Sequence, residues 1–279
     1  MINGTRFRID TDIARQAALA ARIARGQADI ASGKRLQTAS EDPAASARLA
    51  VLRRHDIDMK IWSANADGAA SIAARADSAL SAVGILLDRA RELVTSAASD
   101  TLSQADRAGI AGELVGLADE IDAVSGETDG SGARVFPVQA ATGIPVGRDV
   151  TLTATATYAD VFTVTAGGGS TDLATLLRNA GAALNSATAA RAVALADVAA
   201  ASDHLSAVRG EQGVRAARID SARDRITVAQ TNGAEERQTL EATDVPGTIA
   251  RMQGDQLALD AAQALFAKVN RRTLFDLLG

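Results

Sequence analysis

The sequence has no cysteine, and its 279 residues include only two histidines, four prolines, one tryptophan, one tyrosine and five phenylalanines. Without cysteine there is no disulfide framework, no thiolate nucleophile and no thiolate metal site. His55 and His204 stand apart in the sequence, and neither lies in a zinc-protease pattern. We therefore expect a protein that is not an enzyme and that uses no cofactor and no metal.

The charge balance excludes two further classes of partner. The 29 basic and 34 acidic residues give a net charge of -5 and an isoelectric point near 5.2, which supplies no electrostatic footprint for nucleic acid or an anionic membrane. The longest uncharged runs, such as 135–147, are shorter than the roughly 20 residues that span a bilayer. Charges at Arg6, Arg8 and Asp10 interrupt the apolar core that a signal peptide would need. We expect a soluble chain without a cleaved signal peptide.

Alanine dominates the composition instead, with 63 residues, and it favours long helices that pack closely on one another. Asp42 followed by Pro43 is typical of a helix start, and no proline intervenes from there to about residue 99. Within that stretch, apolar residues step by four and three from Ile72 to Ala97, as in a coiled-coil seam. Further helical patterns cover 9–31, 110–124, about 184–240 and the segment after Pro246. The fold class predicted is mainly α, an elongated coiled-coil helical bundle built from both chain ends.

A change of composition marks a small β insert. Residues 125–132 consist of glycine, serine and other polar residues that favour turns. Residues 150–157 and 161–165 alternate apolar with hydroxyl side chains, which predicts a β-hairpin joined near 158–160. We expect the triple glycine at 167–169 to end this hairpin, Ser170 or Thr171 to cap the next helix, and the hairpin to project outward. These glycines lack the lysine and the spacing of a phosphate-binding loop.

These patterns predict three regions. Residues 1–40 and 245–279 would form a terminal helical domain for assembly. Residues 41–130 and 172–244 would form a helical rod domain, and residues 131–171 the small β insert.

The two terminal helices are the most informative feature, because each carries an apolar stripe and is separated from the rest by a polar loop. In one interpretation the two stripes cover each other within a single copy. In the other, they find partners only in neighbouring subunits, since an isolated helix of this kind is marginally stable in water. The stripe residues proposed as the assembly interface are Ile9, Ile13, Ile23, Ile30, Ile249, Met252, Leu259, Phe266, Val269 and Leu277.

Several segments resemble the bacterial flagellin family. The N-terminal ones are 30–36 (IASGKRL), 40–45 (SEDPAA), 65–69 (NADGA) and 89–93 (RAREL), and the C-terminal one is 255–278. The resemblance covers roughly 5–125 and 190–279, in order. Within the family, the sequence at 41–45 and the ending at 265–278 are more similar to proteins of the hook–filament junction than to filament subunits.

The resemblance implies a structural component of the bacterial flagellum, a hook-associated adaptor that joins hook to filament by helical self-assembly. Its implied partners are another hook-associated protein, flagellin subunits, an export chaperone and further copies of itself. The implied location is extracellular, after type III export without a cleaved signal. Two alternatives remain open: a filament-forming flagellin, and a surface ligand-binding module carried by the insert.

Overall fold

The computed structural model describes residues 2–99, 101–130, 132–141, 143–166 and 168–275, with side chains from residue 9 to residue 268. The chain divides into two compact units. The terminal unit comprises Met1–Asp56 and Thr231–Gly279, and the central unit comprises Ile57–Gln230. Two long helices, α2 (Pro43–Ala97) and α6 (Thr188–Glu241), contribute to both units.

The mainly helical fold predicted from the sequence is confirmed. Asp42 starts α2 as predicted, because its carboxylate accepts a hydrogen bond from the backbone N–H of Ala45 at 3.0 Å. The helix expected from about residue 184 to residue 240 is α6, which begins at Thr188, because α5 continues to Leu184. The remaining helices are α1 (Ile2–Ser32), α3 (Gln104–Ser125), α5 (Leu173–Leu184) and α7 (Val245–Phe275), with the short α4 (Tyr158–Phe162) inside the insert.

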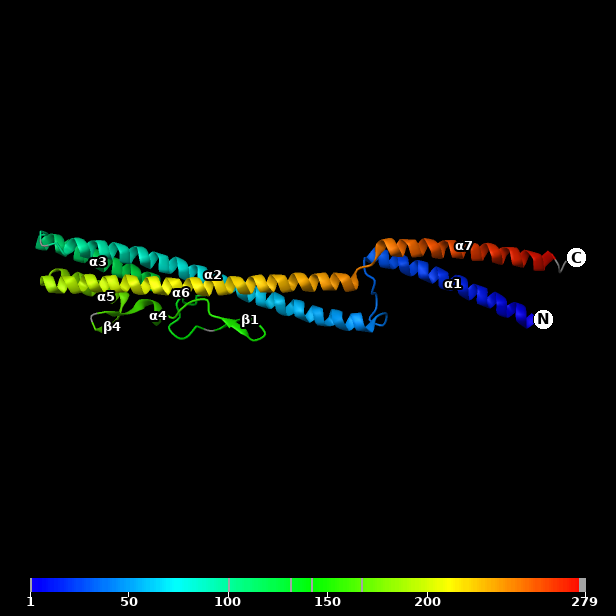
Figure 1. Ribbon diagram of the computed structural model, residues 1–279, viewed down its shortest axis with the longest axis horizontal. Helices are drawn as coiled ribbons and strands as arrows, with labels where there is room; N and C mark the ends of the chain where they lie inside the picture. Colours follow the sequence, from blue (N-terminus) through cyan, green and yellow to red (C-terminus); the bar gives the residue numbers. More distant parts are fainter. Residues whose placement is uncertain (1, 100, 131, 142, 167, 276–279) are drawn as a thin grey trace. The chain divides into compact units, whose positions relative to one another are not determined.

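The core of the central unit lies between α2, α3, α5 and α6 (Figure 1). The inner row of α2 includes Leu80, Val83 and Leu87, which are almost completely buried and share one apolar cluster with Val198 and Leu205 of α6. Alanines fill the intervening core positions. Because they are small, these positions let the helices approach without large side chains between them.

Helices α3 and α5 pack closely beside this pair. A Cβ atom on Gly181 would lie 3.1 Å from the backbone oxygen of Ala111, so α5 needs glycine at this position. On the solvent side Arg178 binds Asp119 at 2.7 Å and Asp122 at 2.5 Å. These ion pairs raise the pKa of Arg178 and hold α5 against α3.

The predicted hairpin between 150–157 and 161–165 is wrong. Instead, β1 (Ile144–Gly147) pairs with β2 (Val150–Leu152), and β3 (Thr163–Ala166) pairs with β4 (Gly169–Asp172), both antiparallel. The residues expected as a turn form α4, because Thr157 and Asp160 cap each other's backbone N–H groups. This capping pattern was present in the sequence and outweighed the strand propensity of the neighbouring threonines.

The triple glycine does not end the hairpin as predicted, because Gly168 lies in the turn between β3 and β4 and Gly169 begins β4. Gly168 has φ of +81°, a conformation that glycine adopts without strain. Ser170 and Thr171 consequently lie in β4, and Asp172 stands at the start of α5.

The insert lies along the helices and does not project outward as predicted. Val146, with Ile144 and Leu152, packs into clusters with residues of α2 and α6 such as Met59 and Ala222. Asn65 of α2 donates a hydrogen bond to the carbonyl of Pro145 at 2.8 Å. Apolar residues of β1 and β2 were available for burial, and the two long helices supply the surface that covers them.

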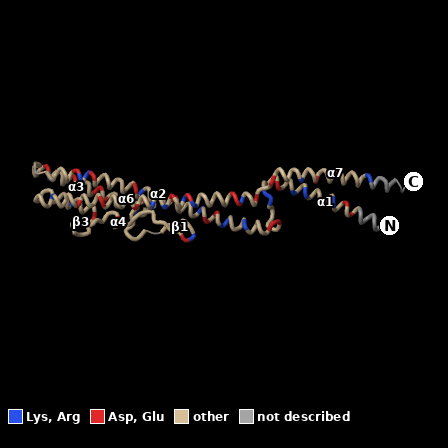
Figure 2. Tube along the Cα trace, in the orientation of Figure 1, with Lys and Arg blue, Asp and Glu red and all other residues tan. Residues whose placement is uncertain are grey.

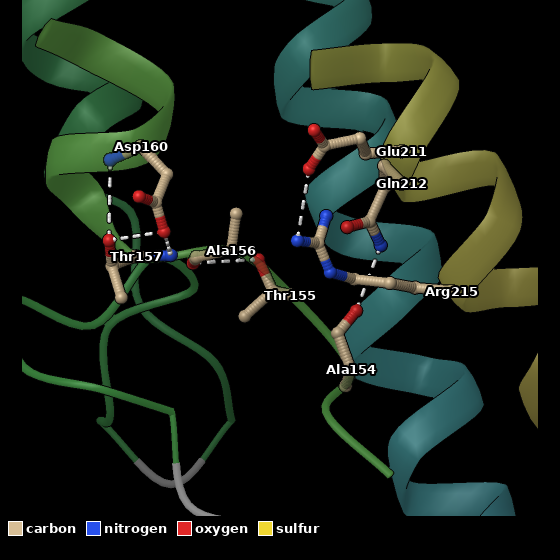
Figure 3. A network of polar contacts seen from close by, with 8 residues as sticks. All are labelled: Ala154, Thr155, Ala156, Thr157, Asp160, Glu211, Gln212 and Arg215. Carbon is tan, nitrogen blue, oxygen red and sulfur yellow. Dashed lines mark hydrogen bonds and ion pairs between the residues drawn. The ribbon is translucent and has the colours of Figure 1, made fainter. Parts of the chain in front are cut away.

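A buried glutamine ties the next part of the insert to the helices (Figure 3). Gln212 of α6 is 1% exposed, and its Nε2 donates to the carbonyl of Ala154 at 2.8 Å and to that of Ala73 in α2 at 3.4 Å. Gln212 therefore ties the segment between β2 and α4 to both α2 and α6. Nearby, Arg215 lies beside the insert and binds Glu211 at 3.3 Å.

Helix α2 contains an 18-residue window that is long and apolar enough to cross a membrane by composition alone. A third of that window is buried inside the protein. Charged residues divide α2 into short uncharged runs, so a count of uninterrupted runs does not reveal this window. Its apolar composition is explained by the core of the central unit, to which α2 contributes its inner row.

Candidate assembly surface

In the terminal unit, α1 and α7 lie side by side (Figure 1). Less exposed positions recur along each helix at steps of mainly three and four residues, the spacing of a coiled-coil seam. We call these two sets the paired rows. They comprise Ile9, Gln16, Leu19, Ile23, Gly26 and Ile30 on α1, and Thr248, Met252, Asp255, Leu259, Ala262 and Phe266 on α7.

The helices approach each other closely at Gly26. A Cβ atom at this position would lie 3.1 Å from Sδ of Met252 and 3.5 Å from a methyl carbon of Thr248. Thr248 is also the only residue of α7 that is buried among those whose side chains the structure describes. The pair is therefore tight at one point and offers little apolar burial elsewhere.

Polar contacts fasten the pair to the loop at 33–42. Arg22 binds Asp255 at 3.0 Å, joining α1 to α7, and Arg25 binds Glu41 of the loop at 2.7 Å. The backbone N–H of Arg35 donates to the carbonyl of Glu241 at 2.8 Å. Gly33, at φ of +67°, lets the chain leave α1 toward this contact.

The carboxylates of this loop have lowered pKa values. The backbone N–H of Gln37 donates to Glu41 at 2.9 Å, and this hydrogen bond is the main reason that the pKa of Glu41 is lowered. The N–H of Ala45 lowers the pKa of Asp42 in the same way, assisted by Arg35. Both groups are ionised at neutral pH and fix the start of α2.

The structure places the predicted stripe residues in two groups. Ile9, Ile23, Ile30, Met252, Leu259 and Phe266 belong to the paired rows and are partly buried. Ile13 and Ile249 are 53% and 40% exposed and lie off these rows. The side chains of Val269 and Leu277 are outside the described residues. Six of the predicted residues thus lie on the paired rows, and two lie exposed outside them.

Sequence reasoning missed the largest exposed apolar side chains of α7. Leu257 and Leu265 are 73% and 63% exposed. They lie on a second row of α7, the open row, whose other members are the exposed Ala250, Gly254, Ala258, Ala261 and Ala264. A single stripe of large side chains was predicted for this helix. The sequence also contains a second stripe at steps of three and four residues, in which small residues separate the leucines, and this second stripe could have identified the open row.

This surface is suited to binding another protein. Among the residues that the structure describes, no three His, Asp or Glu side chains gather as metal ligands would. Figure 2 shows acidic and basic residues interspersed along the helices of each unit. The open row and Ile13 are apolar, exposed and carried on rigid helices, which is the chemistry of a helix–helix interface.

Comparisons with known proteins show which proteins the chain is similar to. Residues 15–141 match the bacterial flagellin N-terminal helical region. The chain is 32% identical to flagellin of Escherichia coli K12 over 134 residues, which are 48% of this chain and 26% of that protein. It is 30% identical to flagellar hook-associated protein 3 of Salmonella typhimurium over 107 residues, 38% of this chain and 34% of that protein. The matches therefore span about a quarter to a third of these relatives.

Solved structures show the same fold. Hook-associated protein 3 of Legionella pneumophila superposes with a TM-score of 0.62 at 12% identity, covering 69% of this chain and 98% of that one. FlgL of Xanthomonas campestris superposes with a TM-score of 0.58 at 17% identity, covering 67% of this chain and 99% of that one. The predicted resemblance to the flagellin family is confirmed.

Proposed function

We propose that this relative of the bacterial flagellins is a structural, non-enzymatic component of the flagellum that joins hook to filament by assembling with copies of itself and with neighbouring flagellar proteins. The observation that carries the proposal is the open row of α7. A folded copy leaves Leu257 and Leu265 uncovered although they lie on an ordered helix. Burying such residues between copies supplies association free energy at roughly 25 cal/mol per Å².

The proposal assigns a task to each region. Residues 1–40 and 245–279 form the assembly domain, and residues 41–130 and 172–244 form a rod that contacts neighbouring subunits. The predicted stripe residues act there in two ways: those of the paired rows hold α1 to α7, while Ile13 and Ile249 join the open row in contacts between subunits. The insert, which packs on the rod, stiffens it.

The proposed partners are another hook-associated protein on one side and flagellin subunits on the other. Before export, a chaperone would shield the terminal helices in an apolar groove, since an amphipathic helix binds such grooves through residues spaced by three and four. The proposed location is the hook–filament junction outside the cell. Support comes from the similarity to proteins named hook-associated protein 3 in both sequence and fold.

Immunogold labelling of intact flagella tests the proposal. Label confined to a short band at the distal end of the hook is the expected result. Label along the whole filament would instead support a filament-forming flagellin, the alternative favoured by the sequence match to flagellin. Absence of label from flagella would refute both.

A further inference from the structure

The outer face of α2 in the central unit carries a regular row of exposed residues that is almost free of charge. Its members recur at steps of three and four, and all are exposed except Ala82, which is partly buried. Ile57, Ile61 and Ile85 are 56%, 54% and 68% exposed. The outer row of α2 comprises Ile57, Ile61, Ala64, Gly68, Ser71, Arg75, Ser78, Ala82 and Ile85.

A second such row follows the outer face of α6. Val193, Val214 and Val228 are 53%, 52% and 58% exposed, and the spacing is again three and four. Only two charged residues interrupt it, Asp203 and Asp224. The outer row of α6 comprises Val193, Ala196, Ala200, Asp203, Ala207, Gly210, Val214, Ala217, Ser221, Asp224 and Val228.

The two outer rows cannot cover each other within one copy. The inner rows of α2 and α6 face one another in the core, with Leu80 and Leu205 in the same cluster. Each outer row lies about two residues away from an inner row along its helix, which is roughly 200° around the helix axis. The outer rows therefore point away from each other, on opposite sides of the α2–α6 pair.

We propose that copies of this chain join side by side in the central unit, with the outer row of α2 in one copy packed antiparallel against the outer row of α6 in the next. Charge selects the register. Arg75 and Asp203 make no ion pair or hydrogen bond within the part of the chain that the structure describes. Arg75 is the only charged residue of its row, and Asp203 is one of two in the other. Placing them opposite one another pairs the single cation of one row with an anion of the other.

That register also matches the side-chain sizes. Gly68 lies seven residues before Arg75 and Gly210 seven after Asp203, so glycine faces glycine and the backbones can approach closely. Ile85 lies ten residues after Arg75 and Val193 ten before Asp203, so two large apolar side chains meet. Ile85 lines a shallow apolar hollow of about 390 Å³ between α2 and α3, which provides room for the valine.

The interface joins two different surfaces, so it is heterologous and repeats from copy to copy. Such an interface generates either a closed ring or an open helix. The inference rests on the proposed function, because it supplies a lateral contact for self-assembly. It adds which faces meet, their direction and their register.

Disulfide cross-linking tests the register directly, because the chain has no cysteine of its own. Full-length Ile85→Cys is mixed with full-length Val193→Cys, concentrated until light scattering reports association, and oxidised. A disulfide needs Cα atoms about 5.5–6 Å apart, so a dimer on a non-reducing gel is expected. The matched control mixes Ser78→Cys with Val193→Cys. Ser78 is on the same row but one heptad, about 10 Å, out of register, so no dimer is expected.

Charge reversal gives an independent readout. Arg75→Asp should weaken association about tenfold, since it replaces an attraction by a repulsion, and Asp203→Arg should do the same. Copies that carry both substitutions should associate like the unmodified chain. Circular dichroism should show unchanged melting in all three variants, because the two side chains are exposed in a single copy.

Three results would overturn the inference: equal cross-linking in the control mixture, failure of the double reversal to restore association, or a chain that stays monomeric up to its solubility limit. Immunogold labelling of flagella decides the proposed function separately. Label at the hook with no cross-link would refute the outer-row contact and leave the proposed function standing.

Discussion

Replacing both leucines of the open row, in the variant Leu257→Asp with Leu265→Asp, should prevent assembly without unfolding the chain. Full burial of a leucine side chain is worth about 1.5–3 kcal/mol. Leu257 and Leu265 are 73% and 63% exposed, so roughly two thirds of that free energy remains to be gained on assembly. Burial of the two leucines then contributes about 2–4 kcal/mol of association free energy per copy. Its loss should raise the concentration at which assembly begins by at least about thirtyfold.

The cost to a single copy is much smaller. Aspartate is a poorer helix former than leucine by roughly 0.5 kcal/mol per residue, and neither leucine lies on the paired row of α7. The helical circular dichroism signal of the variant should therefore match that of the unmodified chain. Leu259→Asp provides a contrast: Leu259 is partly buried on the paired row, so this variant should loosen α7 from α1 as well.

Sedimentation of the purified chain over a range of concentrations is the measurement, and Gln253→Asp with Gln263→Asp is the matched control. This control introduces the same two negative charges on the same helix at exposed polar positions. If the double leucine variant assembled at the same concentration as the control, the open row would not be an interface. If it lost helical signal in proportion to its loss of assembly, the effect would be one of folding, and the reasoning would again be refuted.

The remaining predictions concern the stability of a single copy. The hydrogen bond from the N–H of Ala45 lowers the pKa of Asp42 from 3.8, so the ionised carboxylate stabilises the start of α2 fully above pH 3.8, and this stabilisation is lost as the pH falls below that value. Hydrogen exchange at the start of α2 should therefore rise on acidification, and Asp42→Asn should remove this dependence of exchange on pH. Phe162→Ala should lower the free energy of unfolding by about 3–5 kcal/mol, measured in urea, because this ring is completely buried and lies edge-on to Phe136; a loss below about 1 kcal/mol would contradict the packing described. Gly116→Ala should raise the melting temperature, since its Cβ would meet nothing within 4 Å, whereas Gly181→Ala should lower it because the backbone of α3 cannot move aside; the same sign for both would contradict this assignment.

The helices could be predicted because their signals are local and strong. Asp42 and Pro43 mark one helix start without any tertiary information, and the spacing of three and four from Ile72 to Ala97 identifies a buried face. In an alanine-rich sequence, however, more than one face of a helix satisfies that spacing. Which face is covered depends on the neighbouring helix, and so Leu257 was missed.

The strand pairing of the insert could not be predicted from the sequence, because its signals are weak and not local. Its strands are three or four residues long, and their pairing depends on contacts with helices distant in the sequence. Asn65 of α2, for example, donates to the carbonyl of Pro145, which is 80 residues away. Alternation of threonine and valine carries no information about such partners, so it predicted strands in approximately the right region with the wrong pairing.

The terminal unit is closed by contacts between residues far apart in the chain. Arg35 donates to the carbonyl of Leu240 across 205 positions, and Thr243 to that of Asp29 across 214. Closing a flexible loop of this length costs about 5 kcal/mol of entropy, so these contacts form more readily once the central unit has folded and shortened the loop. The same separation in sequence means that α1 is synthesised long before α7. Helix α1 leaves the ribosome early and has to wait, without its partner, until Asp255 has been added, and for that interval its paired row is open to any protein that binds nascent chains.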